Sequence, residues 1–121
     1  MPTVLLIEDD VSLRSLFREW LSHGPYRVWD RSDIAASSAW NVNLVVVDLR
    51  NLRKEAGVTV TQVKHAYPNA QVIGLSTQLT RAMDEASPLA LALGVKALLP
   101  KPCGQEELLE VVRAALGPAA R

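Results

Sequence analysis

The chain has 121 residues, of which 49% are hydrophobic, and its 13 basic and 13 acidic residues give a formal net charge of 0. This length and composition predict one globular domain with a single core, and they argue against a disordered chain. The balanced charge argues against direct nucleic-acid binding, and the absence of a long apolar run argues against a membrane span.

The N-terminal part alternates short apolar runs with helical patterns. Residues 3–7 are a nearly continuous apolar run, as expected for a strand that is covered on both faces. Apolar residues then recur at helical spacing over 10–22, where Asp10 or Ser12 can cap the first turn. We expect the next elements in this order: a strand over 26–29, a short helix over 34–40 and a strand over 44–47.

The C-terminal part continues the alternation. After a polar loop over 49–57, we expect a helix over 58–67 and strands over 71–75 and 96–99. Residues 80–93 have a helical pattern that Pro88 interrupts, and Ser87 can cap a short helix over 88–93 that follows a separate turn. The last helix is expected over 105–116, and residues 117–121 are a tail or the start of a linker.

Five strands that alternate with five helices predict an α/β fold, in which a five-stranded parallel sheet carries helices on both faces. In such a sheet the carboxyl ends of the strands meet at one edge, where open α/β sheets place their sites. We therefore expect the whole chain, residues 1–121, to be one domain with its site at that edge.

Charged and hydroxyl residues follow four of the predicted strands. They are Glu8 and Asp9 after the first strand, Asp48 after 44–47, Ser76 after 71–75 and Lys101 after 96–99. Each has a simpler structural interpretation: acids beside a helix start, a turn-forming Asp, an N-cap Ser and a surface Lys. Together they predict a crevice with three carboxylates and one ammonium, which suits a divalent cation and a phosphoryl group.

Each residue of this crevice has an expected role. Mg²⁺ takes one or two carboxylates and keeps several waters, so we expect Asp9 to bind it directly and Glu8 to act through water. Asp48 would stay ionised beside the metal and could attack phosphorus. Lys101, before a Lys-Pro bond that could be cis, would pair with Asp48 and then with phosphoryl oxygens, and Ser76 would donate its hydroxyl to one of them.

The chain resembles the receiver domains of response regulators in bacterial two-component signalling. The matching segments are Leu6 to Asp10, Val46 to Arg50, Leu75 to Thr77 and Lys101-Pro102. The resemblance implies a doubly wound, flavodoxin-like sheet in the order 2-1-3-4-5. It also implies a phosphoacceptor protein, not a classical enzyme, with self-catalysed phosphotransfer and autodephosphorylation.

By this resemblance, Asp48 takes a phosphoryl group from a histidine kinase or a histidine phosphotransfer domain. Mg²⁺ would be held by Asp9, Asp48 and the backbone carbonyl of Arg50, with Glu8 completing the acidic pair. Ser76 matches the hydroxyl that moves on activation, and Lys101 matches the family's lysine. The downstream protein target stays open. With a single cysteine, Cys103, and no signal peptide expected at the N-terminus, we expect a cytoplasmic protein.

Four positions depart from the family pattern. Leu52 replaces a Pro four residues after Asp48, and Glu55-Ala56-Gly57 replaces an Asp-Gly, so the loop after Asp48 should differ in shape. Leu98 replaces the aromatic residue that usually moves inward on activation, and Thr77 replaces a smaller residue and could narrow access to Asp48. By the same resemblance, the side chains of Arg50 and Gln78 are expected to tune dephosphorylation.

Three alternative functions remain open from the sequence. The departures favour a receiver-like pseudo-domain that acts by protein contact without phosphorylation. A hydrolase with an aspartyl nucleophile would be expected to carry a second Asp two residues after Asp48, where this chain has Arg50. A flavodoxin-like cofactor module would need Gly, Ser or Thr in the turn after the first strand, where this chain has acids.

Overall fold

The structure is a computed structural model that describes residues 1–33 and 36–117. Within these residues six strands form one sheet in the order β2-β1-β3-β4-β6-β5. The strands are β1 (Thr3–Ile7), β2 (Arg27–Asp30), β3 (Leu44–Asp48), β4 (Gln71–Ser76), β5 (Met83–Asp84) and β6 (Ala97–Pro100). All neighbours pair in parallel except β5 with β6. The predicted parallel α/β fold and its strand order are therefore confirmed, with one short strand added at an edge.

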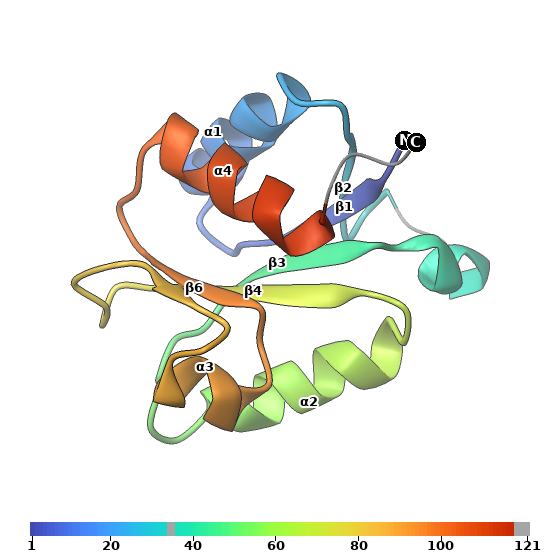
Figure 1. The fold of residues 1–121 in the computed structure, drawn as a ribbon. Coiled ribbons are helices and arrows are strands. Elements are labelled where there is room, and N and C mark those ends of the chain that lie inside the picture. Colours follow the sequence, from blue (N-terminus) through green and yellow to red (C-terminus); the bar gives the residue numbers. More distant parts are fainter. Residues whose placement is uncertain (34–35, 118–121) are drawn as a thin grey trace.

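Helices cover both faces of the sheet. Helices α1 (Val11–Ser22) and α4 (Gln105–Leu116) lie on one face, and α2 (Ala56–Ala66) and α3 (Pro88–Leu93) lie on the other (Figure 1). The described part of the predicted helix over 34–40 is a 3-10 helix, η1 (Ala36–Asn41). Residues 34 and 35, and the tail from residue 118, lie outside the described residues. Among the described helices, none has the length and apolar character that a membrane span requires.

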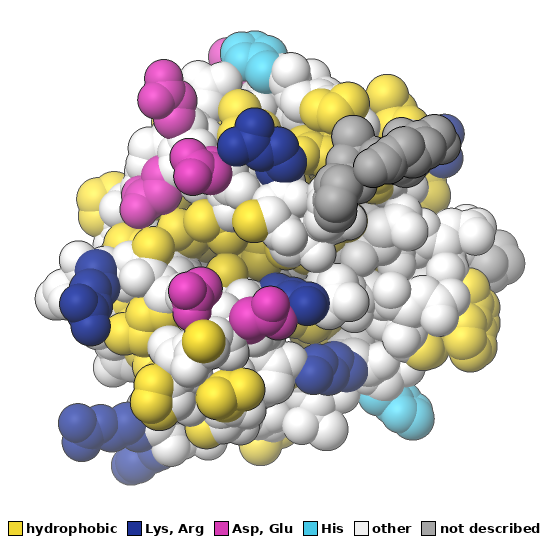
Figure 2. Space-filling model, in the orientation of Figure 1, with side chains coloured by type: hydrophobic (Ala, Val, Ile, Leu, Met, Phe, Trp, Pro, Cys, Tyr) yellow, Lys and Arg dark blue, Asp and Glu magenta, His cyan; other side chains and the backbone are white. Residues whose placement is uncertain are grey.

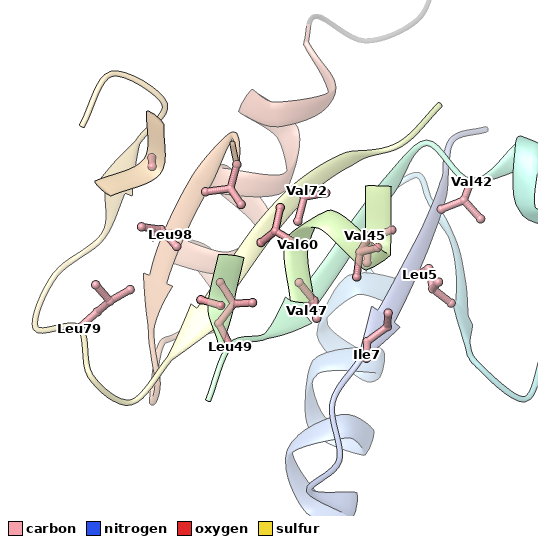
Figure 3. Close-up of a cluster of buried hydrophobic side chains, with 14 residues drawn as sticks. Leu5, Ile7, Val42, Val45, Val47, Leu49, Val60, Val72, Leu79 and Leu98 are labelled. Atoms are coloured by element: carbon pink, nitrogen blue, oxygen red, sulfur yellow. The ribbon is translucent and has the colours of Figure 1, made fainter. Parts of the chain in front are cut away.

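Alternate residues of the central strands supply two separate apolar layers. Leu5 and Ile7 of β1 join Val45 and Val47 of β3 in the layer that packs under α2, where their side chains point the same way (Figure 3). The intervening residues of the same strands face α1 and α4 and join the other layer. Both layers are buried, as the uninterrupted apolar runs predicted.

The predicted caps of two helices are confirmed. The Asp10 carboxylate accepts a hydrogen bond from the Leu13 N–H at 3.0 Å, and the Ser87 hydroxyl accepts one from the Ala90 N–H at 3.0 Å. Helix α3 ends at Gly94, whose φ of 76° lies in the left-handed region that glycine adopts without strain. The cap at Asp10 fixes the direction in which the chain leaves the acidic segment.

One boundary prediction was wrong, and one strand was missed. Helix α2 begins at Ala56, inside the predicted 49–57 loop. The short helix expected over 88–93 after a separate turn is confirmed as α3, whereas the strand at Met83–Asp84, which pairs antiparallel with β6, was not predicted. The physical reason is local: the Asp84 carboxylate accepts a hydrogen bond from the Ala86 N–H at 2.9 Å, which forms a turn that competes with a helix.

The added strand borders a shallow groove on the surface. Figure 2 shows apolar side chains in a hollow between α4 and the β5–β6 edge, with acidic side chains on either side. The groove has a volume of about 350 Å³. Its lining comprises Ala82, Met83, Asp84, Glu85, Lys96, Ala97, Val111, Ala114 and Ala115. It lies away from the strand ends that carry the predicted site residues.

Candidate functional site

The carboxyl ends of the parallel strands bring the predicted residues to one edge of the sheet. Asp48 is the last residue of β3 and pairs in register with Leu75 of β4. Ser76 is the last residue of β4 and pairs with Pro100 of β6, so that the next residue, Lys101, donates its N–H to the Ser76 carbonyl at 2.9 Å. The register therefore carries Lys101 to the edge at which Asp48 ends.

Lys101 lies between two carboxylates. Its ammonium Nζ is 2.7 Å from Glu8 Oε1 and 2.9 Å from Asp48 Oδ1. The side chains of Lys101, Glu8 and Asp48 are only 9%, 2% and 16% exposed. The Lys101-Pro102 peptide bond is cis. The structure thus pairs Lys101 with Asp48 as the sequence predicted, and adds Glu8 as a second and more deeply buried partner.

The surroundings of Lys101 favour its charged form. Burial lowers its pKa, but the hydrogen bonds to Glu8 and Asp48 outweigh burial, so the pKa of Lys101 lies above its ordinary value. A lysine whose pKa is raised by folding contributes its full stabilisation below the ordinary lysine pKa. That stabilisation is lost only as the pH rises through the raised value. The ammonium is therefore present throughout the neutral pH range.

Glu8 is fully engaged by protein groups. Besides its bond to Lys101, its Oε2 accepts a hydrogen bond from the Asp10 N–H at 3.1 Å. Arg14 donates to the Glu8 carbonyl at 3.1 Å. In this arrangement Glu8 holds the lysine, which is a different role from the water-mediated metal contact predicted from the sequence.

Asp9 faces the opposite way from Glu8. Its side chain is 70% exposed, and its Oδ2 is 2.6 Å from Nη2 of Arg50, whose side chain is 68% exposed. Asp9, Asp48 and Arg50 all line one cavity of about 150 Å³ at the ends of β1 and β3. The rest of the lining comprises Ile7, Arg31, Val47, Glu55 and Thr59.

This cavity fits a hydrated Mg²⁺ better than an ion enclosed by protein. Within the described residues, no group of three His, Cys, Asp or Glu side chains is placed to hold a metal. Mg²⁺ usually takes only one or two carboxylates and keeps several waters, however, and three carboxylates, Asp9, Asp48 and Glu55, line this cavity. The donor set therefore includes the expected ligands Asp9 and Asp48, and the water-mediated contact expected of Glu8 stays a prediction.

Ser76 takes part in a hydrogen-bond chain between the loops beside Asp48. Its hydroxyl accepts a hydrogen bond from the Gln78 N–H at 3.0 Å, and the Gln78 side-chain oxygen accepts one from the Leu52 N–H at 2.8 Å. Ser76 is fully buried. Because a hydroxyl donates as well as accepts, its O–H can still be offered to a new acceptor.

The sequence did not predict every residue that lines this edge. Arg50 was expected to contribute its backbone carbonyl and, through its side chain, to tune dephosphorylation, but its side-chain bond to Asp9 was not predicted. Arg31 and Glu55 line the cavity from the loops after β2 and before α2. The available signal for Arg31 was its position close behind a predicted strand, whereas Glu55 lay inside a predicted loop, and nothing in the sequence indicated that Arg50 would meet Asp9.

Comparisons with known proteins identify relatives of the chain. No protein-family model matches the chain. The chain is 32% identical to the regulatory protein VirG of Agrobacterium fabrum over 120 residues, which cover 93% of this chain and 45% of that protein. This chain belongs to the response-regulator receiver family. It spans less than half the length of the VirG proteins that it matches.

Solved receiver structures share the fold. A CheY-like receiver domain protein from Methanospirillum hungatei aligns with a TM-score of 0.71 at 20% identity, over 96% of this chain and 94% of that one. The chemotaxis protein CheY4 of Vibrio cholerae aligns with a TM-score of 0.71 at 21% identity, over 95% of this chain and 98% of that one. At these identities the likeness concerns the fold alone.

The positions that depart from the receiver pattern have clear surroundings in the structure. Leu98 is fully buried in the apolar layer under α2, opposite Gly74 of β4. Thr77, by contrast, is exposed at the end of β4. Leu98 therefore packs as core in this receiver domain, and Thr77 lies at the surface beside Ser76.

Proposed function

We propose that this receiver domain is a phosphorylation-activated switch of a two-component phosphorelay, in which Asp48 accepts the phosphoryl group. The observation that carries the proposal is the ammonium of Lys101, which lies 2.9 Å from Asp48 and is held there by buried Glu8. A fixed cation beside a partly exposed carboxylate is suited to an incoming phosphoryl group, whose oxygens are negatively charged.

The proposed transfer is a displacement at phosphorus. An oxygen of Asp48 forms a bond to phosphorus while the bond from phosphorus to the donor's imidazole nitrogen breaks, and the electron pair of that bond stays with the imidazole. Lys101 stabilises the charge on the phosphoryl oxygens, and catalysis consists mainly of positioning and electrostatics. The product, an aspartyl phosphate, carries about −1.5 to −2 charges where one carboxylate was.

In this proposal Mg²⁺ would be held by Asp9, Asp48 and the Arg50 carbonyl, and would neutralise charge on the phosphoryl oxygens. Ser76 would then move to donate its O–H to the new phosphate, and this movement would open the Ser76–Gln78–Leu52 chain. Because that chain joins the loops after β3 and β4, its opening would shift both loops. This is the two-state element through which phosphorylation would be transmitted.

Intact mass spectrometry after incubation with acetyl phosphate and Mg²⁺ tests the proposal. We expect an adduct of about 80 Da that is present in the parent and absent from Asp48→Asn. Asp10→Asn is the matched control, because Asp10 is exposed and caps α1, and it should keep the adduct. A parent protein that never gains the adduct, with this donor or with a phosphorylated histidine kinase, would support the pseudo-domain alternative.

One specific observation concerns the switching step rather than phosphorylation itself. Leu98, in the position of the family's aromatic residue, is fully buried, so a phosphorylated Asp48 would have no aromatic side chain there to draw inward. A domain that takes the phosphoryl group but shows no change in its loops would separate phosphorylation from switching. Amide chemical shifts of Gln78 and Leu52, with and without phosphorylation, make that distinction.

The proposed partners follow from the proposed chemistry. The phosphoryl donor would be a histidine kinase or a histidine phosphotransfer domain, and the output would pass to a downstream protein. Autodephosphorylation would be self-catalysed by the same site. We propose a cytoplasmic location, which is supported by the single cysteine and by membership of the receiver family.

A further inference from the structure

Arg50 gives the acidic cavity a cation of its own. Its guanidinium is 2.6 Å from Asp9, and both side chains line the cavity that Asp48 also faces. The carboxylate oxygens of Asp9 are the ligands that a divalent cation would need. Asp9 therefore has two possible cationic partners at this cavity. One is the Arg50 guanidinium, which the protein supplies, and the other is a divalent cation.

The backbone around Arg50 is fixed although its side chain is exposed. The Leu49 N–H donates to the Leu75 carbonyl at 2.7 Å, and the Asn51 carbonyl accepts from the N–H groups of Glu55 and Ala56 at 3.0 and 2.9 Å. These bonds hold the two residues that flank Arg50. The guanidinium is thus delivered to Asp9 from a defined anchor, and it can leave without disturbing the loop.

We propose that Arg50 competes with Mg²⁺ for Asp9, so that cation binding and release of the Arg50 guanidinium are coupled. This inference rests on the proposed Mg²⁺ site at Asp9 and Asp48. An exposed ion pair is weak, so it can be displaced at ordinary Mg²⁺ concentrations. While it persists, it adds a positive charge at the cavity and occupies an Asp9 oxygen, and both effects weaken Mg²⁺ binding. Once released, the guanidinium lies two residues from Asp48, beside the phosphoryl group that would arrive there.

The test is a titration of the unphosphorylated protein with MgCl₂ alone, at constant ionic strength, followed by amide chemical shifts of residues around Asp9 and Asp48. We expect Arg50→Ala to lower the Kd for Mg²⁺ about three- to tenfold. Arg50→Lys keeps the charge but loses the planar guanidinium, so its Kd should lie between those of Arg50→Ala and the parent. In the parent, the Arg50 Nε–H resonance should shift with the same midpoint as the amides.

Arg53→Ala is the matched control. Arg53 is exposed on the same loop, so its removal takes away an equal charge at a greater distance from Asp9. We expect it to change the Kd less than twofold. Equal Kd values for the parent, Arg50→Ala and Arg53→Ala would overturn the competition while leaving the Mg²⁺ site intact. An equal decrease of the Kd in both variants would also overturn it, because the effect would then come from net charge alone. If no protein shows saturable shifts near Asp48, the proposed Mg²⁺ site itself fails.

Discussion

Two neighbouring acids at the end of β1 lie in opposite surroundings. Glu8 is directed inward, is 2% exposed and binds Lys101, whereas Asp9 is directed outward, is 70% exposed and binds Arg50. Each pair joins an acid after the first strand to a cation from a distant loop. An ion pair between a carboxylate and a cation therefore occurs twice at this edge of the sheet, once buried and once exposed to water.

The difference in exposure assigns the two pairs different tasks. A buried pair costs desolvation and is kept only when its geometry is good, and breaking it by removing one partner is expensive. An exposed pair is screened by water and contributes about 0–1 kcal/mol. The Glu8–Lys101 pair is therefore suited to hold the ammonium beside Asp48, and the Asp9–Arg50 pair is suited to exchange partners.

Breaking the buried pair should have the largest effect. Lys101→Met keeps the length of the side chain but leaves the Glu8 carboxylate buried without its cation. We expect the free energy of unfolding at pH 7 to fall by about 3–5 kcal/mol, measured by urea denaturation.

A control and a rescue keep this prediction specific. Lys96→Met removes a lysine beside β6 whose side chain is 35% exposed and whose partner Glu85 is 64% exposed, and it should cost less than about 1 kcal/mol. Adding Glu8→Gln to Lys101→Met removes the stranded charge and should recover part of the loss. Equal costs for the two lysine variants would mean that burial does not distinguish the pairs.

The buried end can also be disturbed through the packing beneath it. A Cβ at Gly74 would overlap the side chain of Leu49 and come within 2.9 Å of Leu98 Cδ2, and both leucines are buried. Because Leu49 directly follows Asp48, Gly74→Ala should shift the end of β3 and lower the free energy of unfolding by about 1–3 kcal/mol.

Gly57→Ala is the matched control for this substitution. Gly57 lies in α2, and a Cβ there meets nothing within 4 Å, so Ala should stabilise the helix by up to about 1 kcal/mol. Thermal unfolding of the two variants should move in opposite directions. If Gly74→Ala were as stable as the parent, the close packing of Leu49 and Leu98 against this strand would not restrain the buried end.

The sequence was sufficient to predict how the strand ends converge. Apolar runs before Asp48 and Ser76 indicated strands covered on both faces, and a parallel sheet has only one edge for their carboxyl ends. The pairing of Lys101 with Asp48 followed from that convergence. These predictions depended on local pattern and on a topology with few alternatives.

The rest depended on contacts that a local pattern does not contain. Strand β5 forms because two residues, Met83 and Asp84, pair with β6, and the helical spacing around them gave no sign of it. The different partners of Glu8 and Asp9 depend on which of the two side chains is buried after β1 ends, and on the position of the Arg50 side chain at the sheet edge. Adjacent acids look alike in a sequence, and only burial separates them.

The exposed pair should show the smallest effect on stability. Arg50→Gln removes the charge but keeps a polar side chain of similar reach, and we expect the free energy of unfolding to change by less than about 1 kcal/mol. The parent should lose this small contribution as NaCl rises towards 1 M, where the screening length falls to about 3 Å, so that the parent and the variant converge. Urea denaturation at low and high salt measures both quantities. A loss of unfolding free energy in Arg50→Gln that matched the loss in Lys101→Met, or that did not depend on salt, would show that Asp9 and Arg50 form a structural pair. A metal ion could then no longer displace Arg50 from Asp9 at little cost.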